Sequence, residues 1–232
     1  MNYRLPVFLI ALTLAANITD DAVAQSPMMR KGVSVQMAIT TNASPMPEAD
    51  NEDAWVVTVT ADGNLYFAAD PMTPDELSDW MKSHPRNREA KLYIKADARA
   101  HFASVEKVLE IGRAMGFQKP VLLTAQAEHT APGTMVSPKG LDISVGSAFP
   151  SGTVATLVQL LPSGQEPPLL EINNDQTSWS ALESTLRQHF QKGDDKLVLL
   201  KINGDLPFAD VVHAIDNCRA AGAQVYVAAP GA

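Results

Sequence analysis

Residues 92–116 read LYIKADARAHFASVEKVLEIGRAMG, and residues 198–222 read VLLKINGDLPFADVVHAIDNCRAAG. The two stretches match at a spacing of 106 residues, which brings Lys95 opposite Lys201 and Gly116 opposite Gly222. Each contains a short apolar run, a polar loop and an amphipathic helix pattern that stops at glycine. An internal repeat decides the architecture, because both copies are expected to fold into the same unit.

The match extends in both directions from this stretch. Upstream, residues 31–37 correspond to residues 139–145 at a spacing of 108, and downstream residues 121–123 correspond to residues 225–227 at a spacing of 104. Residues 127–138 contain Pro132-Gly133 and Pro138, which predicts a linker. We therefore predict a first domain over residues 25–126 and a second domain over residues 139–232.

The secondary structure predicted for one copy follows the order ββαβαβ. In the first copy, residues 55–60 and 65–67 alternate around an Asp62-Gly63 turn, which predicts a hairpin. Thr73 and Glu76 form a capping box at the start of a helix that we expect to end at Pro85. A strand is predicted at 92–94, a helix at 102–115 and a final strand at 121–124.

The second copy repeats this order with strands over 157–161, 169–172, 197–200 and 224–227, and helices over 178–190 and 208–221. The predicted fold class is α+β: two tandem ββαβαβ units, each a small mixed sheet with two helices packed on one face. The polar, proline-bearing residues 40–53 are predicted to form an extended or mobile loop of the first copy.

The N-terminus has the features of a signal peptide over residues 1–24. Arg4 is followed by an apolar run over 5–16, and Ala22-Val23-Ala24 is a cleavage site of the A-x-A type. The run is shorter than the roughly 20 residues that cross a bilayer, so we expect cleavage and export to the periplasm. The alternative is an uncleaved anchor in the inner membrane, with the rest of the chain on its periplasmic side.

Composition and motifs argue against several classes of function. The formal net charge is −8, without a cluster of Lys and Arg, so no nucleic acid partner is expected. The five histidines lack metal-ligand spacing, and the sequence has neither a nucleophile elbow nor a phosphate-binding loop. Cys218 lies on the apolar stripe of the last helix and is expected to be a buried structural thiol. We expect no cofactor, no metal and no catalytic residue.

The repeat also resembles a known family. The strand and loop at 92–97, the helix from Phe102 to the Gly116 stop, the strand at 121–123 and the hairpin at 56–63 resemble the periplasmic domain of the ExbD/TolR family. The resemblance covers both copies, although the second has Asn203 where the first has Asp97. It implies work beside a proton-channel partner in the inner membrane, coupling proton flow to TonB-type uptake or to envelope integrity. It also implies a periplasmic domain that can dimerise.

The sequence departs from this family at the N-terminus. Members carry one transmembrane helix with an essential Asp, but no Asp lies within residues 5–16, and Asp20 and Asp21 follow the apolar run. A proton-relaying carboxylate needs an apolar surround that raises its pKa. We therefore expect a non-catalytic, periplasmic ExbD/TolR-like binding module for TonB/Tol-type biopolymer transport or envelope maintenance. The alternatives are a diverged membrane-anchored ExbD-type subunit and an uncharacterised periplasmic enzyme.

Four residues are candidates for an interaction site because they lie at the ends of the two central strands: Lys95, Asp97, Lys201 and Asn203. For Asp97 the competing interpretation is a turn former whose carboxylate caps the following backbone. The expected partner is an envelope protein, either a proton-channel subunit or an ExbD/TolR-type subunit, or peptidoglycan. Membrane contact is expected only through that partner or an uncleaved N-terminus. The two copies are also able to pair as an intramolecular pseudo-dimer.

Overall fold

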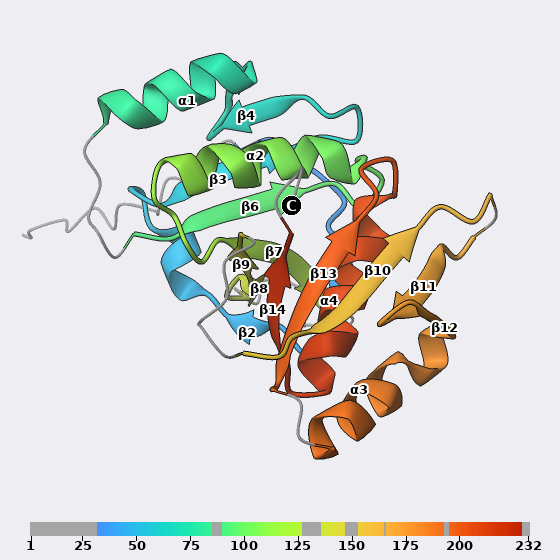
Figure 1. Ribbon diagram of the computed structural model, residues 1–232. Helices are drawn as coiled ribbons and strands as arrows, with labels where there is room; N and C mark the ends of the chain where they lie inside the picture. Colours follow the sequence, from blue (N-terminus) through green and yellow to red (C-terminus); the bar gives the residue numbers. More distant parts are fainter. Residues whose placement is uncertain are drawn as a thin grey trace, which may run out of the picture. The chain divides into compact units, whose positions relative to one another are not determined.

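The first copy folds into a sheet with two helices, in the order predicted from its sequence (Figure 1). The computed structural model describes residues 32–84, 90–126, 136–146, 153–164, 166–192 and 195–228. The predicted signal peptide, most of the predicted linker and Pro85 lie outside these residues. The elements of the first copy are β3 (Trp55–Val59), β4 (Leu65–Phe67), β5 (Asp70–Met72), α1 (Pro74–Ser83), β6 (Leu92–Ala96), α2 (Phe102–Ala114) and β7 (Val121–Gln126).

The helix signals of the first copy act as predicted. At the start of α1, the Glu76 backbone N–H donates to Thr73 Oγ1 at 3.2 Å, and the Thr73 backbone N–H donates to Glu76 Oε2 at 2.7 Å. Past the end of α2, Gly116 has a φ of +85°, a left-handed conformation that costs little without a Cβ. The capping box and the glycine stop are therefore confirmed.

The second copy has the same elements, which confirms the α+β fold. They are β10 (Thr156–Leu161), β11 (Leu169–Ile172), β12 (Asp175–Thr177), η2 (Trp179–Ala181), α3 (Leu182–Gln191), β13 (Leu197–Ile202), α4 (Phe208–Ala220) and β14 (Gln224–Val227). The helix predicted over 178–190 begins as the 3-10 turn η2 and continues as α3.

In each copy, the strand that follows the predicted hairpin was not predicted from the sequence pattern. β5 pairs with β4, and β12 pairs with β11, both antiparallel and in the same register at a spacing of 105 residues. In the second copy, Asn173 and Asn174 both have positive φ values, of 51° and 72°, as a tight turn between these strands requires. The Asn-Asn pair is the sequence signal for β12. The short polar β5 strand contains Pro71, which hides it from a pattern search.

Both sheets contain parallel and antiparallel pairs. Their strand orders differ next to the last strand of each copy, β7 in the first sheet and β14 in the second. The first sheet runs β2-β8-β7-β6-β3-β4-β5 with β1 also paired to β7, and the second runs β12-β11-β10-β13-β14-β9. The additional strands are β1 (Ile39–Thr40), β2 (Ser44–Pro45), β8 (Lys139–Asp142) and β9 (Ser144–Val145).

Residues 139–145 take part in both sheets. β8 pairs antiparallel with β7 of the first copy, whereas β9 pairs parallel with β14 of the second copy. β1 and β9 are equivalent strands, since β1 pairs parallel with β7 and β9 pairs parallel with β14. β1 contacts α4 and β9 contacts α2, so each of these strands packs on a helix of the other copy. The domain boundary that we predict at residue 139 stays a prediction, and it falls at the start of a segment that pairs with both sheets.

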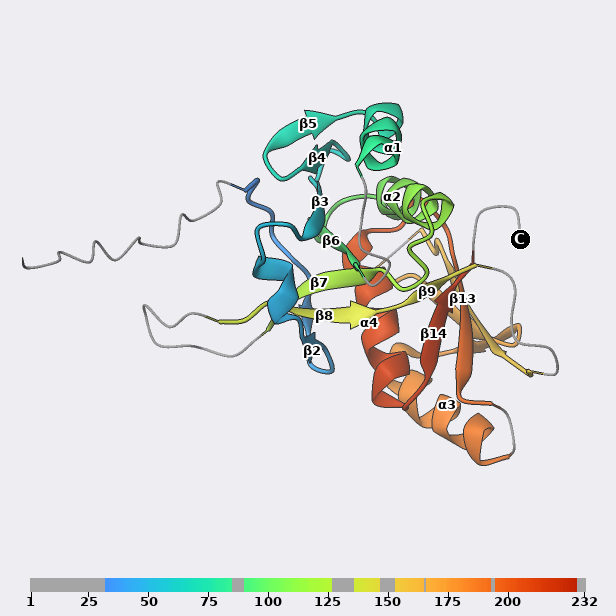
Figure 2. The same cartoon turned by 90° about the vertical axis from the view of Figure 1, so that its left-hand side faces the viewer.

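Helices cover one face of each sheet (Figures 1 and 2). Apolar side chains of the helices and sheets form a continuous core. This core includes Val57, Ile94 and Val105 from the first copy together with Leu200 and Val211 from the second. Residues Lys31–Ala232 accordingly form one unit. Within the described part of the chain, no helix combines the length and the apolar character that a membrane span needs.

The opposite face of the first sheet is covered by a segment that sequence reasoning misread. Residues 40–53 do not form a simple loop: they include β2 and the 3-10 turn η1 (Pro47–Asp50). From this segment Met46 and Ala49 pack on Tyr93, Val121 and Leu123. Apolar residues among the prolines and acids supply the packing that a polar loop would lack.

Strand pairing also corrects the alignment of the last strands. Ile94 lies beside Leu122 in the first sheet, and its equivalent, Leu200, lies beside Val227 in the second. The structural spacing is therefore 105 residues, and the sequence match at 104 was wrong by one. A shift of one residue exchanges the two faces of a strand, which is why Leu122 and Val227 both face the helices.

Candidate interaction site

The loops that follow β6 and β13 bind each other and join the two copies. We call residues 98–103 and 204–209 together the seam. Its four main-chain hydrogen bonds run from Phe102 N to Leu206 O (2.9 Å), Ala103 N to Gly204 O (2.9 Å), Phe208 N to Ala100 O (2.8 Å) and Ala209 N to Ala98 O (2.9 Å). His101 and Pro207 form an antiparallel bridge at the centre of the seam.

The seam is symmetric under exchange of the copies. Adding 106 to the residue of the first copy and subtracting 106 from the residue of the second gives the partner bond: Phe102 N to Leu206 O becomes Phe208 N to Ala100 O. The bond between Ala103 and Gly204 transforms in the same way into the bond between Ala209 and Ala98. Such a self-complementary contact is the isologous interface of a two-fold dimer. Here a single chain forms it with itself.

The seam also caps two helices. The N-cap residues of α2 and α4 are His101 and Pro207, and neither makes a side-chain capping bond. The first N–H groups of a helix lack partners within that helix. In the seam, carbonyls of the other copy accept hydrogen bonds from the first two residues of each helix. The lack of a capping side chain at the start of both helices is a sequence signal for this pairing. Sequence analysis did not use it.

Two of the predicted interaction residues shape the seam loops. Asp97 Oδ1 accepts from the Arg99 backbone N–H at 3.1 Å, and Asn203 Oδ1 accepts from the Asp205 backbone N–H at 2.9 Å. Both residues thus form the same local turn, which either an Asp or an Asn side chain can stabilise. The structure places both in the turn-forming role, beside the seam.

Asp97 has an additional electrostatic environment that Asn203 does not share. Its carboxylate is buried and also accepts from Arg99 Nε at 2.9 Å and from the Gln36 backbone N–H at 3.1 Å. The hydrogen bonds from the Arg99 side chain are the main cause that lowers the pKa of Asp97 to about 2. Asp97 therefore stays ionised at neutral pH and holds the N-terminal segment at Gln36.

The two predicted lysines lie away from the seam bonds. Lys95 is half-buried, and its Nζ donates to the Val33 carbonyl at 3.1 Å. Lys201 is exposed and lies opposite Gln159 in the second sheet. The structure therefore brings Asp97 and Asn203 to the two seam loops but does not gather the four predicted residues around one ligand.

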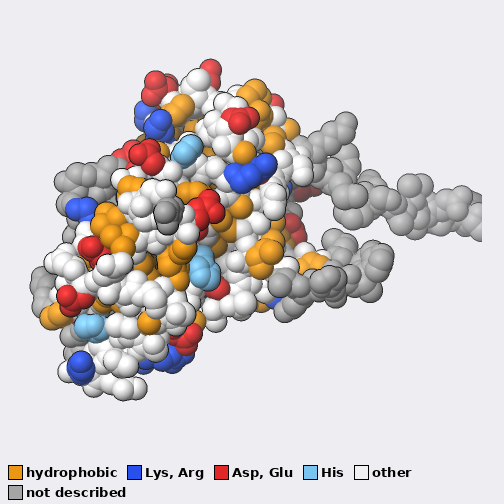
Figure 3. Space-filling model, turned by 90° about the vertical axis from the view of Figure 1, so that its right-hand side faces the viewer, with side chains coloured by type: hydrophobic (Ala, Val, Ile, Leu, Met, Phe, Trp, Pro, Cys, Tyr) orange, Lys and Arg blue, Asp and Glu red, His pale blue; other side chains and the backbone are white. Residues whose placement is uncertain are grey.

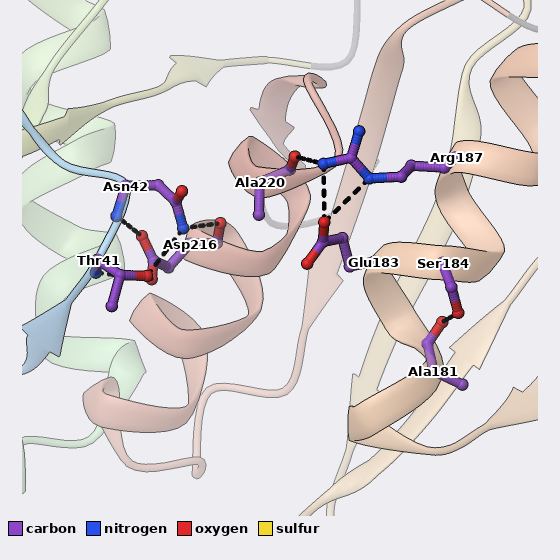
Figure 4. A network of polar contacts seen from close by, with 8 residues as sticks. All are labelled: Thr41, Asn42, Ala181, Glu183, Ser184, Arg187, Asp216 and Ala220. Atoms are coloured by element: carbon purple, nitrogen blue, oxygen red, sulfur yellow. Dashed lines mark hydrogen bonds and ion pairs between the residues drawn. The ribbon is translucent and has the colours of Figure 1, made fainter.

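A buried carboxylate on α4 makes a second connection between the copies (Figure 4). Asp216 is 7% exposed and accepts from the Thr41 backbone N–H at 3.0 Å, Thr41 Oγ1 at 3.0 Å and the Asn42 backbone N–H at 2.8 Å. Sequence analysis missed Asp216, because a lone Asp within a helix pattern gives no signal of a distant partner.

The described surface has a groove beside the first hairpin. A groove of about 580 Å³ is lined by residues of the first hairpin, α1 and α2, and includes neither Asp97 nor His101. Among the described residues, no group of three metal-ligating side chains occurs. On the described face in Figure 3, Lys and Arg side chains form small separate groups between acidic and apolar ones.

These features define a tandem-duplicated α+β protein whose copies pair through their backbones. A family model described as "Biopolymer transport protein ExbD/TolR" matches residues 7–127 and again residues 125–230. The chain therefore belongs to the ExbD/TolR family, whose role is biopolymer transport. A comparison with curated proteins gave no match.

Proposed function

We propose that this protein is a periplasmic, non-catalytic binding module for TonB/Tol-type biopolymer transport or envelope maintenance. In this proposal residues 1–24 are a cleaved signal peptide, and the exported chain lacks the proton-relay helix of its family. Its partner is an envelope protein, a proton-channel subunit or an ExbD/TolR-type subunit; peptidoglycan is the second candidate ligand.

The observation that carries the proposal is the seam. Family members have a periplasmic domain that can dimerise, and the seam has the exchange symmetry of such a dimer within one chain. Because the seam bonds are already satisfied, the chain presents a preformed pair to its partner without a second molecule. The family match over both copies supports the envelope context.

One observation favours a second candidate function. The first family match begins at residue 7, inside the apolar run at the N-terminus. A diverged, membrane-anchored ExbD-type subunit would retain this run as an inner-membrane helix. The intact mass of the protein recovered after export decides between the two, because cleavage after Ala24 would leave Gln25 as the first residue.

Crosslinking in living cells tests the function itself. A photoreactive amino acid is placed at Lys201, which is exposed, and in a parallel strain at Asn203, beside the seam. We expect the captured species to include a proton-channel or ExbD/TolR-type subunit. Sedimentation of the purified chain is expected to give a monomer. Crosslinks to copies of itself alone, together with an obligate dimer in sedimentation, would contradict the proposal.

A further inference from the structure

The groove of about 580 Å³ lies beside the hairpin of the first copy, where β4, α1 and α2 come together (Figure 1). Residues that line it include Gly63, Tyr66, Met72, Pro74, Ser104 and Lys107. Its volume is in the range of ligand-binding clefts, and apolar surfaces alternate in it with hydroxyl groups, the Glu76 carboxylate and the Lys107 ammonium group. The proposed function does not use this groove.

In the second copy a tryptophan side chain occupies the position that corresponds to the groove. The hairpins correspond at a spacing of 105 residues, by the pairing of Leu65 with Met72 and of Leu170 with Thr177. Helices α2 and α4 correspond at a spacing of 106. Counted back from β4 and β11, Pro168 takes the position of Gly63, although the second turn is four residues longer and its own turn glycine is Gly164. Trp179 is equivalent to Pro74 and His213 to Lys107.

In the second copy these three equivalent residues are in contact. Trp179 Nε1 donates to the Pro168 carbonyl at 2.8 Å, and the indole ring stacks on the His213 ring with centroids 5.2 Å apart and an interplanar angle of 26°. The second copy thus places its own indole between the hairpin and the helix. In the first copy Pro74 has no aromatic ring to place there, and the groove remains.

From this difference we propose that the groove of the first copy binds an aromatic side chain, an indole above all, presented by a protein partner. The hairpin main chain offers the indole N–H an acceptor at the position of the Pro168 carbonyl. Lys107 replaces His213 on the opposite wall, where an ammonium group attracts the face of an aromatic ring. The partner's ring would take the place that Trp179 takes in the second copy.

That the partner is a protein rests on the proposed function. The affinity of the groove for an indole is independent of the proposed function. The test therefore uses N-acetyl-L-tryptophanamide as the probe, titrated into the 15N-labelled chain and followed by amide chemical shifts. We expect shifts at residues 63–66, Ser104 and Lys107, and none at residues 169–171 or His213. N-acetyl-L-leucinamide is the control probe and is expected to leave residues 63–66 unshifted.

Two pairs of variants make the test specific. Lys107→Glu is expected to weaken probe binding about fivefold, in line with the loss of a cation–π contact. Lys119→Glu makes the same charge change at an exposed residue outside the groove and is expected to leave binding unchanged. Trp179→Ala empties the second copy and is expected to add a second set of shifts, at residues 169–171 and His213. Pro74→Trp fills the first copy and is expected to abolish binding there.

The outcomes separate this inference from the proposed function. Probe shifts elsewhere on the protein, or none, overturn the inference even when an envelope subunit is captured in cells. Equal affinities of the Lys107→Glu and Lys119→Glu chains overturn the assignment of the groove wall. If Trp179→Ala does not fold, as judged by its amide spectrum, Pro74→Trp alone decides, and unchanged probe binding in that variant refutes the proposal.

Discussion

Replacing Asp216 by Ala removes the carboxylate that α4 contributes to the contact between the copies. Three donors then lose their acceptor: the backbone N–H groups of Thr41 and Asn42, and the Thr41 hydroxyl. Thr41 and Asn42 are exposed, so water replaces part of what is lost. A buried donor without an acceptor costs about 1–3 kcal/mol, and Ala is a better helix former than Asp by roughly 0.5 kcal/mol. We expect a net loss of about 2 kcal/mol in the free energy of unfolding.

The matched variant is Asp216→Asn, which keeps one oxygen acceptor and nearly the same shape. It loses the charge but can still accept a hydrogen bond from Asn42, whose backbone N–H lies 2.8 Å from Asp216 Oδ1. We expect a loss of about 1 kcal/mol for this variant, because a hydrogen bond to a charged group is roughly twice as strong as one between neutral groups.

Urea unfolding followed by tryptophan fluorescence measures the free energy of unfolding of both variants, with a separate reporter in each copy. Trp55 and Trp80 report on the first copy and Trp179 reports on the second, so Phe substitutions give one reporter chain for each. Because one core runs through both copies, both reporters should shift together. The reasoning would be refuted if the free energy of unfolding of Asp216→Ala lay within about 0.5 kcal/mol of the parent's, or if only one reporter shifted.

Three further predictions concern Asp97, Gly204 and Cys218. Because the pKa of Asp97 is lowered to about 2, its ionised form stabilises the fold at neutral pH, and this contribution fades as pH falls from about 4 to about 2. In Asp97→Asn, acid titration of stability should be flatter over that interval, with a loss of about 1 kcal/mol at pH 7, since its arginine partner is largely exposed. A Cβ at Gly204 would lie 3.1 Å from Ala103 Cβ, so Gly204→Val should cost about 1–3 kcal/mol in thermal or urea unfolding, whereas Gly32→Val, in open space, should cost little. Cys218 is fully buried, and burial raises the pKa of its thiol to about 12, so iodoacetamide should label it only on unfolding, as mass spectrometry can follow.

Local signals in the sequence predicted the order of helices and strands in each copy. The capping box at Thr73, the glycine stop at Gly116 and the alternation over 55–60 each act within a few residues of chain. Such signals suffice for the order ββαβαβ, because each element is specified by its own side chains. Because the sequence repeats, the same order could be predicted for the second copy, including the strand at residues 224–227.

The contacts between the copies could not be predicted in this way. The seam uses backbone groups, so residues such as Ala98, Ala100 and Leu206 carry no side-chain pattern that indicates pairing. The Asp216 contact joins residues that are 175 and 174 positions apart, and no local signal spans that distance. Sequence analysis selected Asp97 and Asn203 as a candidate site, and their observed role is to form the turns that present the seam carbonyls.

Pairing through the backbone has a consequence for how the two copies diverge. An interface made of main-chain bonds tolerates many side chains, so the exchange of Asp97 for Asn203 leaves the turn and the seam in place. The same freedom applies outside the seam, where Pro74 in the first copy corresponds to Trp179 in the second. A dimer of identical subunits must present two equal surfaces, but a duplicated chain can keep the symmetric pairing and present one open groove and one filled position. This asymmetry would allow the paired unit to bind its partner in a single orientation.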